Sequence, residues 1–123
     1  MPILDTSFLI RLQAGDTAAR ALLTELAAET LVVPPWVVVE FLTGHTGKPE
    51  RVLEDLDRAF TLAQTTPEWT LEAARFRKKL HDKGAKIRLP DFWIAAYARL
   101  LDTPVVTQNT KHFDALGVET RTW

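Results

Sequence analysis

The chain has 123 residues, of which 46% are hydrophobic and 25% are charged, and this is the composition of one ordinary folded domain. Its 15 basic and 16 acidic residues give a net charge of −1, and the lack of cysteine excludes a disulfide framework. The longest apolar run, at 31–39, is broken by two prolines and is far shorter than the roughly 20 residues of a membrane helix, so we predict a single domain over residues 1–123 that is cytoplasmic and not membrane-bound.

The first half of the chain alternates short β-branched runs with helical patterns. We predict strands at 2–5 and 30–34, and a weaker strand at 60–63. The helices between them are expected to begin at capping residues or at prolines. The first helix runs from a cap at Thr6 or Ser7 to Leu12, and the second is capped by Asp16 or Thr17 and should bury Ala18, Leu22, Leu23 and Leu26. The third helix runs from Pro35 to Gly44. The fourth begins at Pro49 and has Val52, Leu53, Leu56 and Phe60 on one side.

The second half continues this alternation. A longer helix should begin at Pro67 and end near Gly84, and its buried stripe is Trp69, Ala73, Phe76 and Leu80. Another helix runs from Pro90 to about Leu101, and strands follow at 103–107 and, at the edge of the sheet, at 117–123. The predicted fold class is therefore α/β: a three-layer α/β/α domain with a central, mainly parallel sheet of four to five strands. Such sheets bind ligands beyond the carboxyl ends of their strands.

Three carboxylates lie in unusually apolar settings. Asp5 ends the first strand, Glu40 lies within "WVVVEFL", and Asp91 opens "LPDFWIAAYA". Each has an ordinary explanation: Asp5 and Asp91 suit the positive end of a helix, and Glu40 could reach water from the edge of its helix. However, burial of an unpaired carboxylate costs several kcal/mol, and three of them at one sheet edge would repel each other unless a cation lay between them. Mg²⁺ prefers such oxygen ligands, so the pattern predicts a divalent metal site.

The segment "VVTQNTKHF" adds polar residues at the same predicted edge. Thr107 ends the strand at 103–107 and Asn109 comes two residues later, so both should lie at the same edge of the sheet as the acids. Asparagine in a loop is most often a turn or capping residue. Asn109 therefore becomes a site candidate only through its proximity to the three acids.

These segments together resemble the PIN-domain nucleases, particularly the VapC-type toxins of bacterial toxin–antitoxin pairs. The resemblance runs nearly end to end: "ILDTSFLI" matches the family's opening acid at Asp5, "VVVEFLTG" its second acid at Glu40, and "LPDFWIAAYA" its third at Asp91. "VVTQNTKHF" resembles the family's Thr-x-Asp or Thr-x-Asn element, which places Thr107 and Asn109 in the site, with Thr6 and Ser7 in supporting positions.

The resemblance implies a PIN-like nuclease domain that cleaves RNA with Mg²⁺ or Mn²⁺. Asp5, Glu40 and Asp91 would hold the metal, and Asn109 would complete the catalytic set. Many members carry aspartate at the last position, so the neutral amide leaves a second metal in doubt, and the nearby Asp114 reads more simply as a surface acid. The resemblance also implies a VapB-like antitoxin that covers the acidic cleft, and a homodimer.

A basic run precedes Asp91. The stretch 75–88 holds seven of the fifteen basic residues, and it reads either as the solvated face of a helix or as a track for RNA phosphates. The candidate nucleic-acid contacts in it are Arg75, Lys78, Lys79, Lys83, Lys86 and Arg88.

Three other functions stay open on the sequence alone. A metal-free ribonuclease could use two of His45, His81 and His112 as general base and acid, although nothing in the sequence brings them together. A non-catalytic protein-binding module could use the same fold. A housekeeping RNA-processing nuclease would share the chemistry of a toxin and differ only in its biological role.

Overall fold

The computed structural model describes residues 1–82, 84 and 88–123, and its centre is a parallel sheet of five strands. The strands lie in the order β3-β2-β1-β4-β5, and every neighbouring pair is parallel. Each strand is short. They are β1 (Ile3–Leu4), β2 (Val32–Val33), β3 (Thr61–Leu62), β4 (Val105–Val106) and β5 (Thr120–Arg121).

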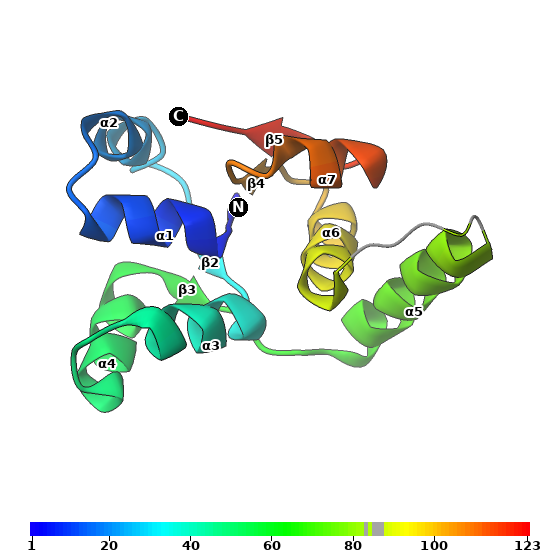
Figure 1. Cartoon of the computed structure of the whole chain (residues 1–123), viewed down its shortest axis with the longest axis horizontal. Helices are drawn as coiled ribbons and strands as arrows, with labels where there is room; N and C mark the ends of the chain where they lie inside the picture. Colours follow the sequence, from blue (N-terminus) through cyan, green and yellow to red (C-terminus); the bar gives the residue numbers. More distant parts are fainter. Residues whose placement is uncertain (83, 85–87) are drawn as a thin grey trace.

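The helices cover both faces of the sheet, which confirms the predicted three-layer α/β/α architecture. Figure 1 shows α1 to α4 on one side of the strands and α5 to α7 on the other. Their bounds are α1 (Thr6–Gln13), α2 (Thr17–Glu25), α3 (Pro35–Gly44), α4 (Pro49–Ala59), α5 (Pro67–Asp82), α6 (Leu89–Leu101) and α7 (Thr110–Ala115). None of the helices in the described part of the chain is both long and apolar enough to cross a membrane.

The order of the strands creates a switch point between β1 and β4. The chain first moves outward from β1 to β2 and β3, and then returns to place β4 on the other side of β1. The segments that leave β1 and β4 therefore diverge to opposite faces of the sheet, and a crevice opens beyond the carboxyl ends of these two strands. Asp5 directly follows β1 and Thr107 directly follows β4, so both lie at this crevice.

Helix α6 is buried on most of its sides, because it lies between the sheet and α5. Its buried residues are Pro90, Asp91, Phe92, Ile94, Ala95, Ala96 and Ala98. The small alanines allow close packing. Trp69 of α5 fixes the outer helix: its ring stacks on Tyr97 at a centroid distance of 4.2 Å, and its Nε1 donates a 2.7 Å hydrogen bond to the Trp93 carbonyl.

Most predicted elements are confirmed, including the weak strand at 60–63, but four details were wrong. Asp5, and not Thr6 or Ser7, is the N-cap of α1, because its extended backbone lets its carboxylate accept from the Thr6 N–H. In α2 the buried alanine is Ala19, one position after the predicted Ala18, and Leu53 of α4 is 40% exposed. Helix α7 was not predicted, because its six residues are too few to show an apolar period.

Candidate metal centre

Asp5 is the most buried acid of the candidate site. Its backbone N–H donates to the Val106 carbonyl at 3.1 Å, which places it at the end of β1 and beside β4. The residue is only 5% exposed, and its Oδ1 accepts a 2.8 Å hydrogen bond from the Thr6 N–H at the start of α1. A carboxylate at this helix end interacts favourably with the helix dipole.

Thr107 holds the second oxygen of Asp5. The Thr107 hydroxyl, which is fully buried, donates to Asp5 Oδ2 at 2.7 Å and accepts from the Asn109 N–H at 3.0 Å. Ser7 lies nearby and accepts a 3.2 Å hydrogen bond from the Gln108 N–H. The segment after β4 is thus bonded to the segment after β1 at two places.

Burial raises the pKa of the Asp5 carboxyl above its ordinary value of 3.8. Hydrogen bonds from the Thr107 hydroxyl and the Thr6 N–H oppose this rise, and the negative charge of Asp91 adds to it. The last effect is informative about geometry, because a like charge raises a pKa only when it is close. Asp91 therefore lies close enough to Asp5 for the two negative charges to repel each other.

Asp91 lies in the first turn of α6 and is 6% exposed. Its Oδ2 is 2.9 Å from Nδ1 of His112, a residue of α7. The sequence predicted Asp91 as a site residue but gave His112 no place beside it, because the contact joins two helices 21 residues apart. The pattern "NTKHF" alone could not indicate which way the histidine points.

Glu40 is the most open of the three acids. The Thr6 hydroxyl donates to its Oε1 at 3.2 Å, which links Glu40 to the first residue of α1. Its Oε2 lies 3.8 Å from a guanidinium nitrogen of Arg88, and its side chain is 32% exposed. Glu40 lies in an apolar stretch of sequence, but in the structure it has a cationic partner and also reaches water.

Asn109 occupies the N-cap position of α7, but its side chain caps no backbone N–H. The ordinary explanation, a capping asparagine, therefore does not account for its amide. Asp114 is exposed on the same helix, as expected for a surface acid.

The donors suit a hard divalent cation in their chemistry. Asp5 and Asp91 repel each other, and their oxygens are ligands that Mg²⁺ or Mn²⁺ accepts. Across residues 1–82, 84 and 88–123, however, no three His, Cys, Asp or Glu side chains gather closely enough to enclose an ion. Asp5 and Asp91 thus form the centre of the candidate site, and Glu40 is connected to it through Thr6.

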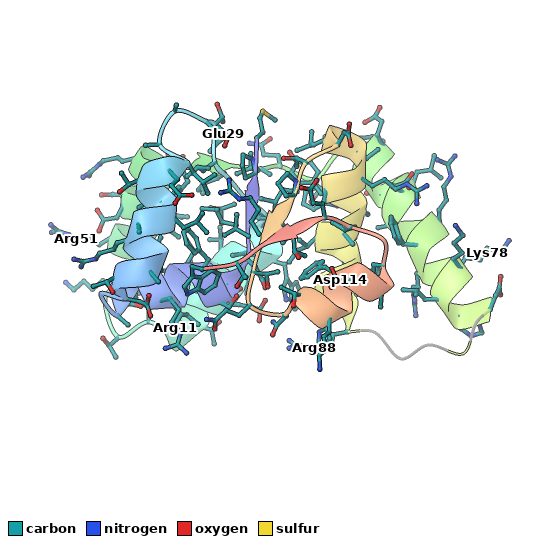
Figure 2. The ribbon with its side chains drawn as sticks, turned by 90° about the horizontal axis from the view of Figure 1, so that it is seen from above. Arg11, Glu29, Arg51, Lys78, Arg88 and Asp114 are labelled. Atoms are coloured by element: carbon teal, nitrogen blue, oxygen red, sulfur yellow. The ribbon has the colours of Figure 1, made fainter. Side chains whose placement is uncertain are left out.

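The predicted basic track is divided by the structure. Arg75 lies 3.4 Å from Glu72 and Arg88 pairs with Glu40, so both already have acidic partners. Lys78 and Lys79 are exposed on α5, where Figure 2 shows Lys78 projecting away from the body of the domain. Lys83 and Lys86 lie outside the described residues.

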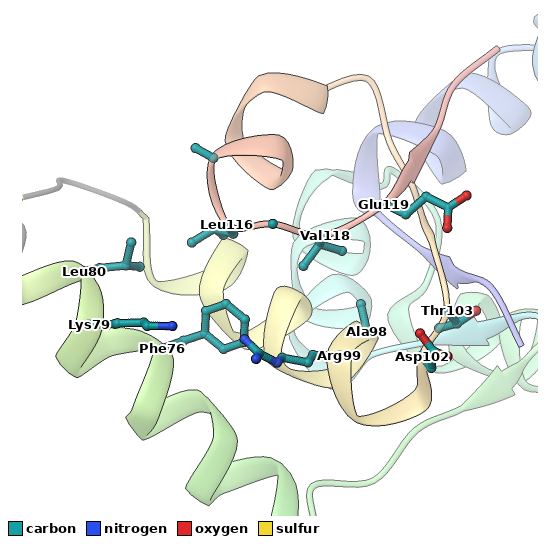
Figure 3. Close-up of a pocket in the computed structure, with 12 residues that line it drawn as sticks. Phe76, Lys79, Leu80, Ala98, Arg99, Asp102, Thr103, Leu116, Val118 and Glu119 are labelled. Carbon is teal, nitrogen blue, oxygen red and sulfur yellow. The ribbon is translucent and has the colours of Figure 1, made fainter.

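A cavity of about 590 Å³ lies elsewhere, between α5, the far end of α6 and the turn after α7. Figure 3 shows Phe76 and Arg99 on one side of it and Leu116 and Val118 on the other. None of the candidate acids lines it. This cavity is therefore not part of the candidate site, which is defined by the buried carboxylates of Asp5 and Asp91.

Comparisons with known proteins agree on the kind of domain. The family model described as "PIN domain" matches residues 3–119. Two proteins named ribonuclease VapC1, from Methanocaldococcus jannaschii, and ribonuclease VapC5, from Mycobacterium tuberculosis, are each 30% identical over 115 residues. The first match covers 93% of this chain and 79% of the relative, and the second covers 87% and 82%.

A solved structure has the same fold. The crystal structure of VapBC2 from Rickettsia felis, bound to a DNA fragment from its promoter, superposes with a TM-score of 0.83 at 22% sequence identity. The superposition covers 98% of this chain and 97% of that one.

Proposed function

This chain belongs to the PIN domain family, and from that premise we propose that it is a metal-dependent endoribonuclease, the toxin of a VapBC-type toxin–antitoxin pair. The names of its relatives support the activity, since VapC1 and VapC5 are called ribonucleases. The observation that carries the proposal is a pair of buried acids whose negative charges repel each other: Asp5, directly after β1, and Asp91, in the first turn of α6.

The proposed mechanism assigns the acids to a cation. A bound Mg²⁺ or Mn²⁺ would supply positive charge to the phosphodiester and lower the pKa of an attacking water. Asp5, Glu40 and Asp91 would hold it, while the Thr107 hydroxyl and the Thr6 N–H keep the Asp5 oxygens in place. Because fixed hydrogen bonds hold Asp5 beforehand, little reorganisation is needed when the reaction occurs.

Asn109 has a smaller role in this proposal. Its amide oxygen is neutral and therefore binds a cation less firmly than a carboxylate would. We assign it to contact with a cation ligand or with the substrate, and we expect one tightly held ion.

The proposed partners are RNA, a VapB-like antitoxin and a second copy of the chain. Exposed apolar side chains support a protein partner: Ile10 of α1 is 51% exposed, and Trp36 and Val39 of α3 are 43% and 54% exposed. These two helices pack against each other. Exposed apolar side chains on two neighbouring helices suit contact with another protein.

A direct test is to incubate the purified protein with mixed cellular RNA, with Mg²⁺ or Mn²⁺ and with excess EDTA. We expect metal-dependent cleavage that is lost in Asp91→Asn and retained in Asp114→Asn, a matched change of an exposed acid. Full activity of Asp91→Asn would refute the assignment. Cleavage that survives EDTA would instead favour acid–base chemistry by histidines.

The biological role needs a separate measurement. If the protein is a toxin, its expression should arrest growth and co-expression of its antitoxin should restore it. A housekeeping nuclease would allow normal growth. Folded protein that neither binds Mn²⁺ nor cleaves RNA would favour a binding module on the same fold.

A further inference from the structure

The contact between His112 and Asp91 joins an exposed side chain to a buried one. The Asp91 side chain is 8% exposed, whereas that of His112 is 53% exposed. His112 therefore covers the carboxylate from the solvent side. Exposed ion pairs contribute little to stability, but a hydrogen bond to a buried carboxylate also fixes the direction in which its oxygens point.

The same short segment of chain also bonds Asp5. Thr107 donates to Asp5 Oδ2, the Asn109 N–H donates back to the Thr107 hydroxyl, and the His112 N–H donates to the Asn109 carbonyl. The segment from Thr107 to His112 thus carries one hydrogen-bonded contact at each end. Thr107, at one end, contacts Asp5, and His112, at the other end, contacts Asp91. The negative charges of these two acids repel each other.

We propose that His112 is a positioning residue for Asp91. Its Nδ1–H donates to Asp91 Oδ2 and leaves Oδ1 free for the cation. This inference rests on the proposed metal-dependent function and adds a residue to it. A carboxylate can only accept a hydrogen bond, so the neutral imidazole tautomer with hydrogen on Nδ1 is sufficient, and no charge on the ring is required.

Two substitutions distinguish the contribution of the His112 hydrogen-bond donor from that of its ring. In His112→Asn the amide nitrogen takes roughly the position of Nδ1, so the donor is kept while the ring is lost. In His112→Phe the ring is kept while the donor is lost. A role in positioning predicts that Phe is the damaging change, whereas a role in packing predicts that Asn is.

The test measures Mn²⁺ affinity by calorimetry without RNA, on variants whose folding is checked by circular dichroism and urea denaturation. Loss of a partner that orients a ligand typically weakens metal affinity 10- to 100-fold, so we expect about tenfold weaker Mn²⁺ binding for His112→Phe and less than about threefold for His112→Asn. His81→Phe is the matched control, because His81 is exposed at the end of α5 and lies in no contact with the three acids in the described structure.

The outcomes separate this inference from the proposed function. If the wild type binds no Mn²⁺, the metal-dependent function fails and the role of His112 fails with it. If the wild type binds Mn²⁺ and His112→Phe binds it equally well or more tightly, only the positioning role is wrong. Equal losses in His112→Asn and His112→Phe, both folded, would also overturn it. If His112→Phe does not fold, a loss of about tenfold in folded His112→Asn overturns the role; if His112→Asn does not fold, wild-type binding by His112→Phe overturns it.

Discussion

The hydroxyl of Thr107 donates a 2.7 Å hydrogen bond to Asp5 Oδ2, and it joins two residues 102 positions apart in the sequence. The bond forms because β1 and β4 pair in parallel, with Ile3 opposite Val105 and Leu4 opposite Val106. Asp5 and Thr107, the residues that directly follow β1 and β4, therefore meet at the crevice. The relationship is a direct product of the sheet register.

Thr107→Val should disturb the site while keeping its shape. Valine removes the donor to a buried carboxylate, and such a loss costs roughly 1–3 kcal/mol, which urea denaturation measures. The pKa of Asp5 should rise further, because the Thr107 hydrogen bond lowers it, so Mn²⁺ binding should require a higher pH. Thr107→Ser keeps the hydroxyl and should behave like the wild type. Unchanged stability and binding in the valine variant would show that the bond contributes nothing.

Asp5→Asn should make the metal-free protein more stable at neutral pH. The folded state binds a proton on Asp5 more tightly than the unfolded state does, so the contribution of Asp5 to stability falls as pH rises from 3.8 to the raised folded pKa, and stays low above it. Removing the charge should raise the free energy of unfolding by roughly 0.5–2 kcal/mol and abolish this fall.

The control for that experiment is Asp114→Asn, an exposed acid whose neutralisation should leave the pH profile unchanged. If Asp5→Asn is less stable than the wild type at neutral pH, the hydrogen bonds to the charged form outweigh the effect of burial.

Mn²⁺ should stabilise the wild type in thermal unfolding. A ligand that binds only the folded state adds about 2.7 kcal/mol at one hundred times its dissociation constant. Asp91→Asn should show no such shift, because it removes one of the two central oxygen donors. A shift of the same size in the variant would place the ion elsewhere.

Neutralising Lys78 and Lys79 should weaken RNA binding in a salt-dependent way. Each phosphate contact to a single strand adds about 0.7 to the slope of log affinity against log salt, so Lys78→Gln with Lys79→Gln should reduce the slope by about 1.4. Binding is measured by fluorescence anisotropy in EDTA, where no cleavage occurs. Arg75→Gln is the matched control, because Arg75 already pairs with Glu72. Equal slopes for the wild type and the double variant would show that Lys78 and Lys79 belong to a solvated helix face and do not contact RNA phosphates.

Trp69→Phe should loosen α5 from α6. The change removes the hydrogen bond to the Trp93 carbonyl and part of the stack on Tyr97, and we expect a loss of roughly 1–3 kcal/mol in the free energy of unfolding. Trp36→Phe should change it by less than about 0.5 kcal/mol, since Trp36 is 43% exposed, whereas Trp69 is buried. Equal effects of the two substitutions would show that the Trp69 contacts are not specific.

Much of the fold could be predicted from the sequence because local signals and tertiary contacts agree. Pro35 and Pro49 each stand at the first position of their helices, and Pro90 lies in the first turn of its helix. The parallel sheet followed from the alternation of elements. Helix α7 escaped prediction because six residues cannot establish a helical period, and its position depends on β4 and β5.

The geometry of the candidate site was predictable in outline only. Asp5, Asp91 and Thr107 each follow a strand or open a helix, and topology brings such positions to one edge. The partners of these side chains follow from rotamers and helix positions that no local pattern encodes. For this reason the pairing of Glu40 with Arg88, and that of Asp91 with His112, emerged only from the structure.

The capping of α1 by Asp5 has a consequence for the metal-free protein. Both oxygens of this acid already accept hydrogen bonds from groups of the same chain, so we expect the protein to fold without divalent ions. In the proposed mechanism, the supply of divalent ions would therefore determine what fraction of the folded protein is active.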